Sequence, residues 1–273
     1  AITIAGFQNI DSWRLVFVAV GLPGILVALF FYFTVKEPKR HLVGAEDEVA
    51  RQSIKGVIRL FSKNKELYGL MLGGLVAHSF YQFSVLVWFP PMLMRTFELS
   101  PGEVGIPYGT VFLLFGFAGA LAVAPVMRWL TNRGYKEAPA IILLSVAILI
   151  IPFAAVAPLM PSFGWCLACF AVSMFCWSMS NTTAFTAFTL VTPNAMRGII
   201  IAIYTMGMNL IGGTIASVFI GILNDDVFGP ENIRYSVALT AVVFLPLCAT
   251  LFAFLRPVYR RHAIAQAETL EAS

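Results

Sequence analysis

The sequence has 273 residues, of which 59% are hydrophobic and only 12% are charged, with a formal net charge of +4. Soluble domains carry about 25% charged residues, so this composition is that of an integral membrane protein. It excludes an intrinsically disordered chain, which is poor in apolar residues, and a disulfide scaffold, because only 4 Cys are present. The excess of 18 Lys and Arg over 14 Asp and Glu is too small to predict a nucleic-acid partner.

Seven stretches are long and apolar enough to cross a bilayer as helices. A crossing takes about 20 residues, and only internal hydrogen bonds satisfy the backbone in lipid. None of the stretches contains Asp, Glu, Lys or Arg, as expected where a charged side chain is costly. We therefore predict an all-α integral membrane protein with seven transmembrane helices. The stretches are residues 15–35, 67–94, 105–127, 138–160, 164–193, 198–223 and 235–255.

The cations between these stretches predict the orientation of the chain. Lys and Arg are retained on the cytoplasmic side during membrane insertion. Of the 18 cations, 15 lie in alternate connections on one side, and the others are Arg14, Arg95 and Arg234. We assign the first side to the cytoplasm, which places the C-terminus inside, and expect a multi-pass protein of the bacterial inner (plasma) membrane.

Residues 36–66 form the longest hydrophilic segment between the predicted spans. Its pattern predicts an amphipathic helix at the cytoplasmic membrane surface, with a solvated linker helix as the alternative. One span, a long basic loop and six closely spaced spans suggest part of a twelve-helix protein. We expect residues 1–35 to end an N-terminal bundle, 67–255 to form a six-helix bundle and 256–273 to be a tail. In the loop, the cations Arg51, Lys55, Arg59 and Lys63 recur every four residues, and Ile54, Ile58 and Phe61 share an apolar face.

Uncharged polar side chains recur one helical turn apart in three of the predicted spans. Polar groups at membrane depth point toward protein or water, so these rows are interpreted as walls of a substrate cavity. The candidate substrate-binding residues are His78, Tyr81, Gln82, Trp177, Asn181, Thr182, Thr186 and Asn209.

The alternative is that these side chains hold helices together, because hydroxyl and amide groups bond between helices where small residues allow close approach. That interpretation is favoured for the row containing Thr182 and Thr186, and for Asn209 beside Gly212 and Gly213. His78 titrates near neutrality when unperturbed. It either carries a coupling proton or donates a hydrogen bond to a neighbouring helix, and the second role is favoured.

Motifs for catalysis or for a cofactor are not found in the predicted spans. Paired acids, HExxH and GxSxG are all missing from them, so we predict a protein that is not an enzyme and has no cofactor or metal. A retinal-binding seven-helix receptor is disfavoured, because the last span contains no lysine.

Several segments carry a family resemblance. The clearest is TPNAMRG at residues 192–198, followed by NLIGG at 209–213 and GILND at 221–225. On these segments and on PPMLMR (90–95), LSP (99–101), SWR (12–14) and EPKR (37–40), the chain resembles the major facilitator superfamily of secondary transporters, from its sixth helix onward. Within that superfamily it looks most like spinster-like members, although sugar and organic-anion carriers share the RG and glycine features.

The resemblance implies a transporter that works by alternating access, with two six-helix bundles rocking around a central cavity. This chain would supply the C-terminal bundle and the last N-terminal helix, and its partners would be the missing N-terminal bundle, the lipid bilayer and a small-molecule substrate. In the loop RWLTNRG (128–134), Arg128 replaces the aspartate of the family motif. The resemblance gives gating or structural roles to Arg133, Gly134, Arg197, Gly198, Gly212 and Gly213.

The predicted spans carry no cation that would face an anionic substrate. We therefore predict an amphipathic or lipid-like substrate. A sugar or organic-anion carrier of the same superfamily is the alternative, and a non-transporting seven-helix membrane protein is the alternative from a different class.

Overall fold

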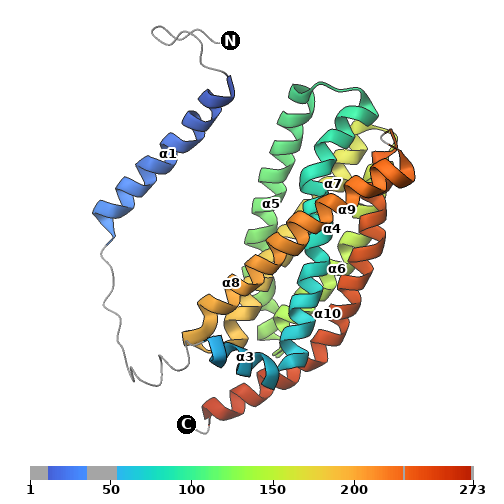
Figure 1. Ribbon diagram of the computed structural model, residues 1–273. Coiled ribbons are helices and arrows are strands. Elements are labelled where there is room, and N and C mark those ends of the chain that lie inside the picture. Colours follow the sequence, from blue (N-terminus) through green and yellow to red (C-terminus); the bar gives the residue numbers. More distant parts are fainter. Residues whose placement is uncertain (1–11, 36–53, 230, 272–273) are drawn as a thin grey trace. The chain divides into compact units, whose positions relative to one another are not determined.

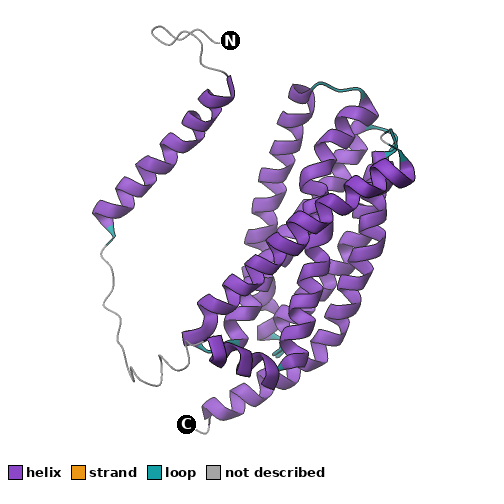
Figure 2. Ribbon diagram, in the orientation of Figure 1, coloured by secondary structure: helices purple, strands orange, loops and turns teal. Residues whose placement is uncertain are grey.

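The computed structural model describes residues 12–35, 54–229 and 231–271, and these ranges are almost entirely helical (Figure 2). The chain divides into two compact units between residues 45 and 46. The predicted motif at 37–40 and the cation Arg51 lie outside the described residues.

The first unit contains one helix, α1 (Ser12–Thr34). Its described side chains are apolar on several sides, and Phe17, Leu22 and Phe30 are all exposed within the unit. A helix that is apolar all round is typical of a membrane span. α1 coincides with the first predicted span, but its strongly apolar part, Gly21–Thr34, is shorter than those of the other helices.

The second unit contains six helices that are long and apolar enough to cross a membrane, counted over the described residues. Each overlaps one of the last six predicted spans, and all but the C-terminal end of the last agree with the prediction within about five residues. The all-helical membrane fold is therefore confirmed, whereas the count of seven crossings stays a prediction. Five of them are α4 (Lys65–Phe97), α5 (Pro101–Asn132), α6 (Ala138–Val156) with the 3-10 turn η1 (Ala157–Leu159), α7 (Phe163–Val191) and α10 (Ile233–Glu271). The sixth is divided into α8 (Arg197–Gly207), the π-helix η3 (Met208–Ile215), α9 (Ala216–Ile222) and the π-helix η4 (Leu223–Phe228), and it follows the 3-10 turn η2 (Asn194–Met196).

Local sequence signals explain where these helices begin and end. Ser100 caps α5 in a capping box with Glu103, and Pro101 occupies the first helical turn. α5 ends before Gly134, whose φ of +85° suits a residue without a Cβ. α10 continues to Glu271, past the predicted end at residue 255, because the Ala- and Glu-rich segment after Pro257 favours a helix. The predicted tail is therefore helical as far as residue 271.

The six helices pack as pairs around a shared core (Figure 1). α4 lies along α10, α5 lies along α7, and α6 packs between α7 and α10. The sixth helix, residues 197–228, packs on α4 through η3 and α9. α5 and the 197–228 helix are the least buried of the six, so they form the margins of a core built from α4, α6, α7 and α10.

The structure has a helix, α3 (Ile54–Lys63), within the loop where an amphipathic helix was predicted. Val57 is buried, and the Phe61 ring lies 4.8 Å from the Tyr68 ring at the start of α4. Ile58, expected on the apolar face, is 59% exposed. Val57 and Phe61 are four residues apart and therefore share the face that packs on α4, whereas the location of α3 at the membrane surface stays a prediction.

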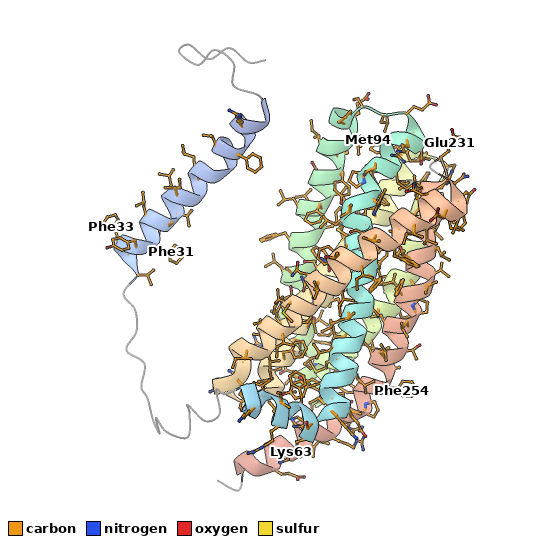
Figure 3. All side chains as sticks on the ribbon, viewed as in Figure 1. Phe31, Phe33, Lys63, Met94, Glu231 and Phe254 are labelled. Atoms are coloured by element: carbon orange, nitrogen blue, oxygen red, sulfur yellow. The ribbon has the colours of Figure 1, made fainter. Side chains whose placement is uncertain are left out.

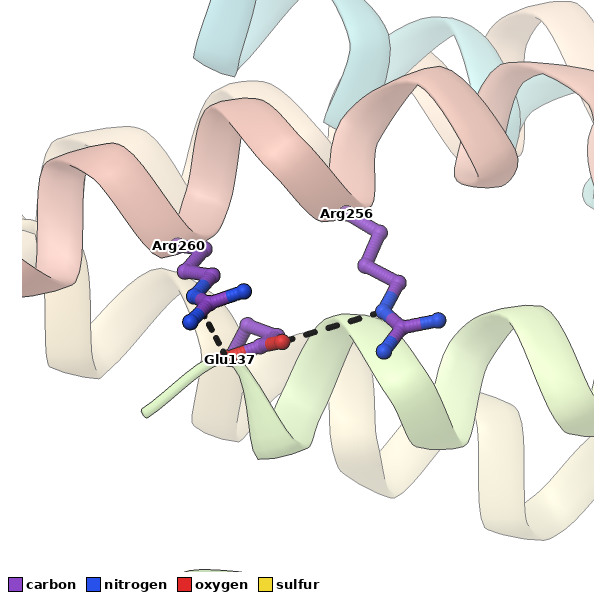
Figure 4. Close-up of polar contacts among 3 residues, drawn as sticks. All are labelled: Glu137, Arg256 and Arg260. Carbon is purple, nitrogen blue, oxygen red and sulfur yellow. Dashed lines mark ion pairs between the residues drawn. The ribbon is translucent and has the colours of Figure 1, made fainter. Parts of the chain in front are cut away.

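A buried carboxylate joins α6 to α10 (Figure 4). Glu137 precedes α6 and is 3% exposed. Its carboxylate oxygens lie 3.7 Å from Nε of Arg256 and 4.0 Å from Nε of Arg260, two cations one turn apart on α10. The arginines are half-exposed or more, so solvent screens these ion pairs, but together they fix the position of α10 against α6.

Two tyrosines join other helices at the same end of the bundle. The Tyr68 hydroxyl of α4 donates to the Val191 carbonyl of α7 at 3.4 Å and lies 3.2 Å from Oγ1 of Thr192. The Tyr259 hydroxyl of α10 donates to the Ala187 carbonyl of α7 at 3.3 Å. This end of α4, α6, α7 and α10 is therefore one connected body.

The closest approach of α5 and α7 generates a test of the packing. A Cβ on Gly119 would lie 2.2 Å from the Phe175 carbonyl oxygen, which belongs to the α7 backbone and has little freedom to move. We expect Gly119→Ala to lower the free energy of unfolding by about 1–3 kcal/mol and to lower the thermal unfolding midpoint in detergent.

Gly116→Ala is the matched control, because a Cβ at Gly116 on the same helix meets nothing within 4 Å. It should leave the midpoint unchanged or raise it slightly, since Ala favours a helix over Gly. Equal midpoints for the two variants would contradict the close packing of α5 on α7.

Candidate substrate site

A small hollow lies where α4, α5 and α7 meet. It is lined by Gln82 and Leu86 of α4, Tyr108 and Phe112 of α5, and Met174 and Trp177 of α7. The volume of this hollow is about 20 Å³. A site of this size accommodates a water molecule or one small substituent of a larger ligand.

Three residues that line this hollow each carry a buried polar atom without a partner. The atoms are Oε1 of Gln82, the hydroxyl of Tyr108 and Nε1 of Trp177, and none has a hydrogen-bond partner among the described residues. Leaving a buried polar group unpaired costs about 1–3 kcal/mol. An amide acceptor, an indole donor and a hydroxyl that does both form a set suited to an uncharged polar group.

Stacked aromatic rings hold Tyr108 in place. Its ring lies 4.9 Å from the Phe170 ring at an interplanar angle of 17°, and Phe170 stacks in turn on Phe89 at 4.6 Å. Phe112, one turn along α5 from Tyr108, lies 5.7 Å from the Trp177 ring. Offset and tilted ring pairs of this kind are favourable, so the hollow has rigid aromatic walls.

Two of the predicted site residues lie inside the packed bundle. His78 is 1% exposed and Tyr81 is 2% exposed. Both ring nitrogens of His78 are unpartnered within the part of the chain that the structure describes, so the expected hydrogen bond to a neighbouring helix is not observed there. A role for His78 in carrying a coupling proton stays a prediction.

The other predicted residues of α7 and η3 are distributed over separate places. Oδ1 of Asn181 accepts a hydrogen bond from the Tyr204 hydroxyl of α8 at 3.3 Å, which joins α7 to α8. Thr182 and Thr186 line a hollow of about 450 Å³ between α5 and α7, although the Thr186 hydroxyl bonds the Thr182 carbonyl of its own helix. Asn209 is exposed and donates to the carbonyl one turn before it. Of the predicted set, only Gln82 and Trp177 therefore share the aromatic hollow.

Two of the four predicted gating glycines, Gly212 and Gly213, lie in the π-helix η3. A Cβ on Gly212 would lie 2.3 Å from Oγ of Ser79, so the Ser79 side chain of α4 packs directly on the η3 backbone, whereas Gly213 faces the Phe83 ring at ordinary contact distance. π-helical turns are rare and recur at functional sites. This close contact makes η3 a candidate point of bending.

The remaining gating candidates lie at the ends of helices. Arg133 ends α5, and its guanidinium lies 3.9 Å from the Trp129 ring centroid, while Gly134 forms the following turn. Nε of Arg197 donates to the Thr192 carbonyl at 3.1 Å, which closes the turn between α7 and α8. Gly198 has open space around its Cα. Arg133 and Arg197 thus bond within their own turns.

Sequence reasoning missed Tyr108 and Phe112. They are two aromatic residues four positions apart on α5, which places them on one helix face, and this spacing was the available signal. Their partners on α4 and α7 follow only from the packing of three helices. Among residues 12–35, 54–229 and 231–271, no group of three His, Cys, Asp or Glu is placed to hold a metal ion.

A comparison with protein families decides the classification. The Major Facilitator Superfamily matches residues 2–217, which is most of the chain. This chain belongs to the Major Facilitator Superfamily. The family prediction is therefore confirmed, and six of its helices follow the membrane-spanning pattern expected for a member of this superfamily.

Solved structures agree with this classification at the level of the fold. A bacterial homologue of the human lysosomal transporter Spinster, in an inward-facing and unoccupied conformation, covers 94% of this chain with a TM-score of 0.67 and 21% identity. The occupied form covers 94% with a TM-score of 0.60 and 22% identity. The chain covers 62% and 61% of those two structures. The resemblance to spinster-like members thus holds for the fold.

Two curated members of the superfamily are similar in sequence. A probable galactarate/D-glucarate transporter of Bacillus subtilis is 28% identical over 45% of this chain. A probable L-galactonate transporter of Escherichia coli is 25% identical over 48% of it. The matches span 31% of the length of each of these relatives.

The hydroxyl of Tyr108 provides a test of the aromatic hollow. In the complete transporter, we expect Tyr108→Phe to raise KM for transport about two- to tenfold, because the ring stays while one hydrogen bond of about 0.5–1.5 kcal/mol is lost. Uptake kinetics normalised to the amount of protein in the membrane measure the effect. Tyr135→Phe is the control, since Tyr135 lies in an exposed turn. An unchanged KM for Tyr108→Phe would remove this residue from the site.

Proposed function

We propose that the complete transporter moves a small amphipathic organic molecule across the membrane by alternating access, and that this chain forms one wall of the substrate pathway. The observation that carries the proposal is the hollow between α4, α5 and α7. Its walls are aromatic and aliphatic, and its polar atoms are uncharged. Such a wall binds an apolar surface by contact and orients a single polar group by hydrogen bonds.

The packing of the bundle supports a division between a rigid body and a moving margin. The ion pairs of Glu137 and the tyrosine bonds join α4, α6, α7 and α10. The 197–228 helix is less buried and contains the π-helix η3 with its glycine contact to Ser79. In an alternating-access cycle, the connected helices move together while the 197–228 helix bends at η3.

Asn181 has a place in this proposal through Tyr204. The bond between them joins α7, which lines the hollow, to α8, which belongs to the moving margin. Loss of the Asn181 amide therefore uncouples the site from the bending helix. His78, Gln82 and Asn181 remain the residues of the predicted set whose replacement by Ala is expected to reduce uptake more than expression.

A second candidate substrate is a sugar acid. It is favoured by the two sequence relatives, whose names describe carriers of galactarate, D-glucarate and L-galactonate. Carboxylates need cations, and the residues lining the hollow include none. Under this alternative, the N-terminal bundle supplies the charges and the aromatic hollow contacts the carbon face of the sugar.

The main proposal also includes the orientation of the chain. The C-terminus lies in the cytoplasm, and the transporter lies in the bacterial inner membrane.

A direct binding assay with the purified complete transporter distinguishes the two substrates. We expect a lysophospholipid to bind and D-glucarate not to compete with it. Trp177→Ala should weaken lysophospholipid binding at least about tenfold, because a central Trp contributes more than 1 kcal/mol to most interfaces.

The matched control is Trp165→Ala on the same helix. Trp165 is 66% exposed, so its replacement should leave the affinity for lysophospholipid unchanged. Tight binding of D-glucarate together with no binding of the lysophospholipid would overturn the amphipathic substrate and support the sugar acid. Equal losses in the two variants would place the substrate away from the hollow.

A further inference from the structure

A second surface with ligand-binding character lies in a groove between α4 and α10. Two hollows of about 430 and 560 Å³ join there and share Lys65, Glu66, Val258 and Arg261. Lys63 on α3 and Phe254 on α10 lie at this same end of the bundle, whereas Met94 and Glu231 lie at the other (Figure 3). This is the end that the cation distribution assigns to the cytoplasm.

One half of the groove is basic. Lys63, Lys65 and Arg261 line it together with a single acid, Glu66, so the local charge is positive. Nη2 of Arg261 lies 3.8 Å from Oε2 of Glu66, with side chains 73% and 68% exposed. An exposed ion pair of this kind contributes about 0–1 kcal/mol. The Arg261 guanidinium can therefore leave Glu66 and bind another anion at little cost.

The other half of the groove is largely apolar. Its lining changes from the charged residues to Gly69, Leu70, Phe254 and Pro257. Gly69 has no side chain to fill the groove and nothing within 4 Å of its Cβ position. Phe254 is 63% exposed. An occupant must therefore present an anion at one end and a hydrocarbon segment at the other.

The neighbouring ion pairs keep this groove in shape. Glu137 binds Arg256 and Arg260 on another face of the same α10 segment. Tyr259 anchors it to α7. The α10 wall is thus held from two directions, which leaves Arg261 directed toward α4.

We propose that this groove is a binding site for an anionic phospholipid of the cytoplasmic leaflet, with the phosphate between Lys65 and Arg261 and an acyl chain along Leu70 and Phe254. Basic pockets between transmembrane helices on the cytoplasmic side recognise anionic headgroups. A free phosphate would make no use of the apolar half, and an acyl chain alone would make no use of the basic half. This lipid site is separate from the aromatic hollow and does not depend on the identity of the substrate.

Native mass spectrometry of the complete transporter tests the proposal with phosphatidylglycerol and phosphatidylcholine of identical acyl chains. We expect phosphatidylglycerol to bind more tightly. Lys65→Gln should weaken its binding about fivefold, and Glu66→Gln should strengthen it by a similar factor, because each changes one charge beside the phosphate. The opposite signs separate a binding effect from a folding defect, which would weaken binding in both variants.

Three controls locate the site. Lys136→Gln, an exposed cation of the α5–α6 connection, should leave phosphatidylglycerol binding unchanged, and so should Trp177→Ala in the substrate hollow. Phe254→Ser should weaken the binding of phosphatidylglycerol and of phosphatidylcholine by the same factor. Millimolar glycerol phosphate should fail to displace phosphatidylglycerol. Equal affinity for the two lipids, equal effects of Lys65→Gln and Lys136→Gln, or displacement by glycerol phosphate would each overturn the proposal.

Discussion

The bilayer's exclusion of unpaired polar groups is the constraint on which the rest of this structure depends. In hydrocarbon, a backbone amide bonds within its helix and a charge moves to an end of the span. The sequence meets the second condition, since the seven apolar stretches contain no charged residue, and the helices of the described residues meet the first. The polar side chains that remain at membrane depth are therefore few and informative. Gln82, Tyr108 and Trp177 are informative because all three line the same hollow and each has a buried polar atom without a partner among the described residues.

Much of the fold could be predicted because it depends on length and hydrophobicity alone. The last six spans, the existence of α3 and the family follow from apolar runs, spacing and short motifs. The continuation of α10 was missed because charged residues mark the end of a membrane span but do not end a helix. The helix continues through them to Glu271. The packing of Val57 in one buried cluster with Tyr68 was not predicted, because the sequence pattern does not reveal tertiary partners.

Prediction of the candidate site was less complete for the same reason. Polar rows on α4 and α7 identified Gln82 and Trp177, but helical spacing alone does not say which face of each helix meets the others. Tyr108 was missed because its aromatic row on α5 resembles lipid-facing sequence. His78 and Tyr81 lie inside the core, and Asn181 is engaged by Tyr204. Tertiary packing therefore determines which polar residues share one site.

The aromatic hollow and the basic end of the bundle have different chemistry. The hollow is aromatic with uncharged polar atoms, and the basic end joins four helices and carries a groove suited to an anionic lipid. Lipid held between α4 and α10 contacts the rigid body rather than the bending helix. In this account, the bilayer sets the position of the body while the substrate contacts its aromatic wall.

Cysteine accessibility at position 112 tests the central claim most directly, because Phe112 lines the hollow. In the complete transporter with its native cysteines replaced, Phe112→Cys should react with a membrane-impermeant thiol reagent, and substrate should protect it. Leu149→Cys, on the exposed apolar surface of α6, should stay unreactive. If position 112 is as unreactive as position 149 with and without substrate, the hollow between α4, α5 and α7 does not face the transport pathway.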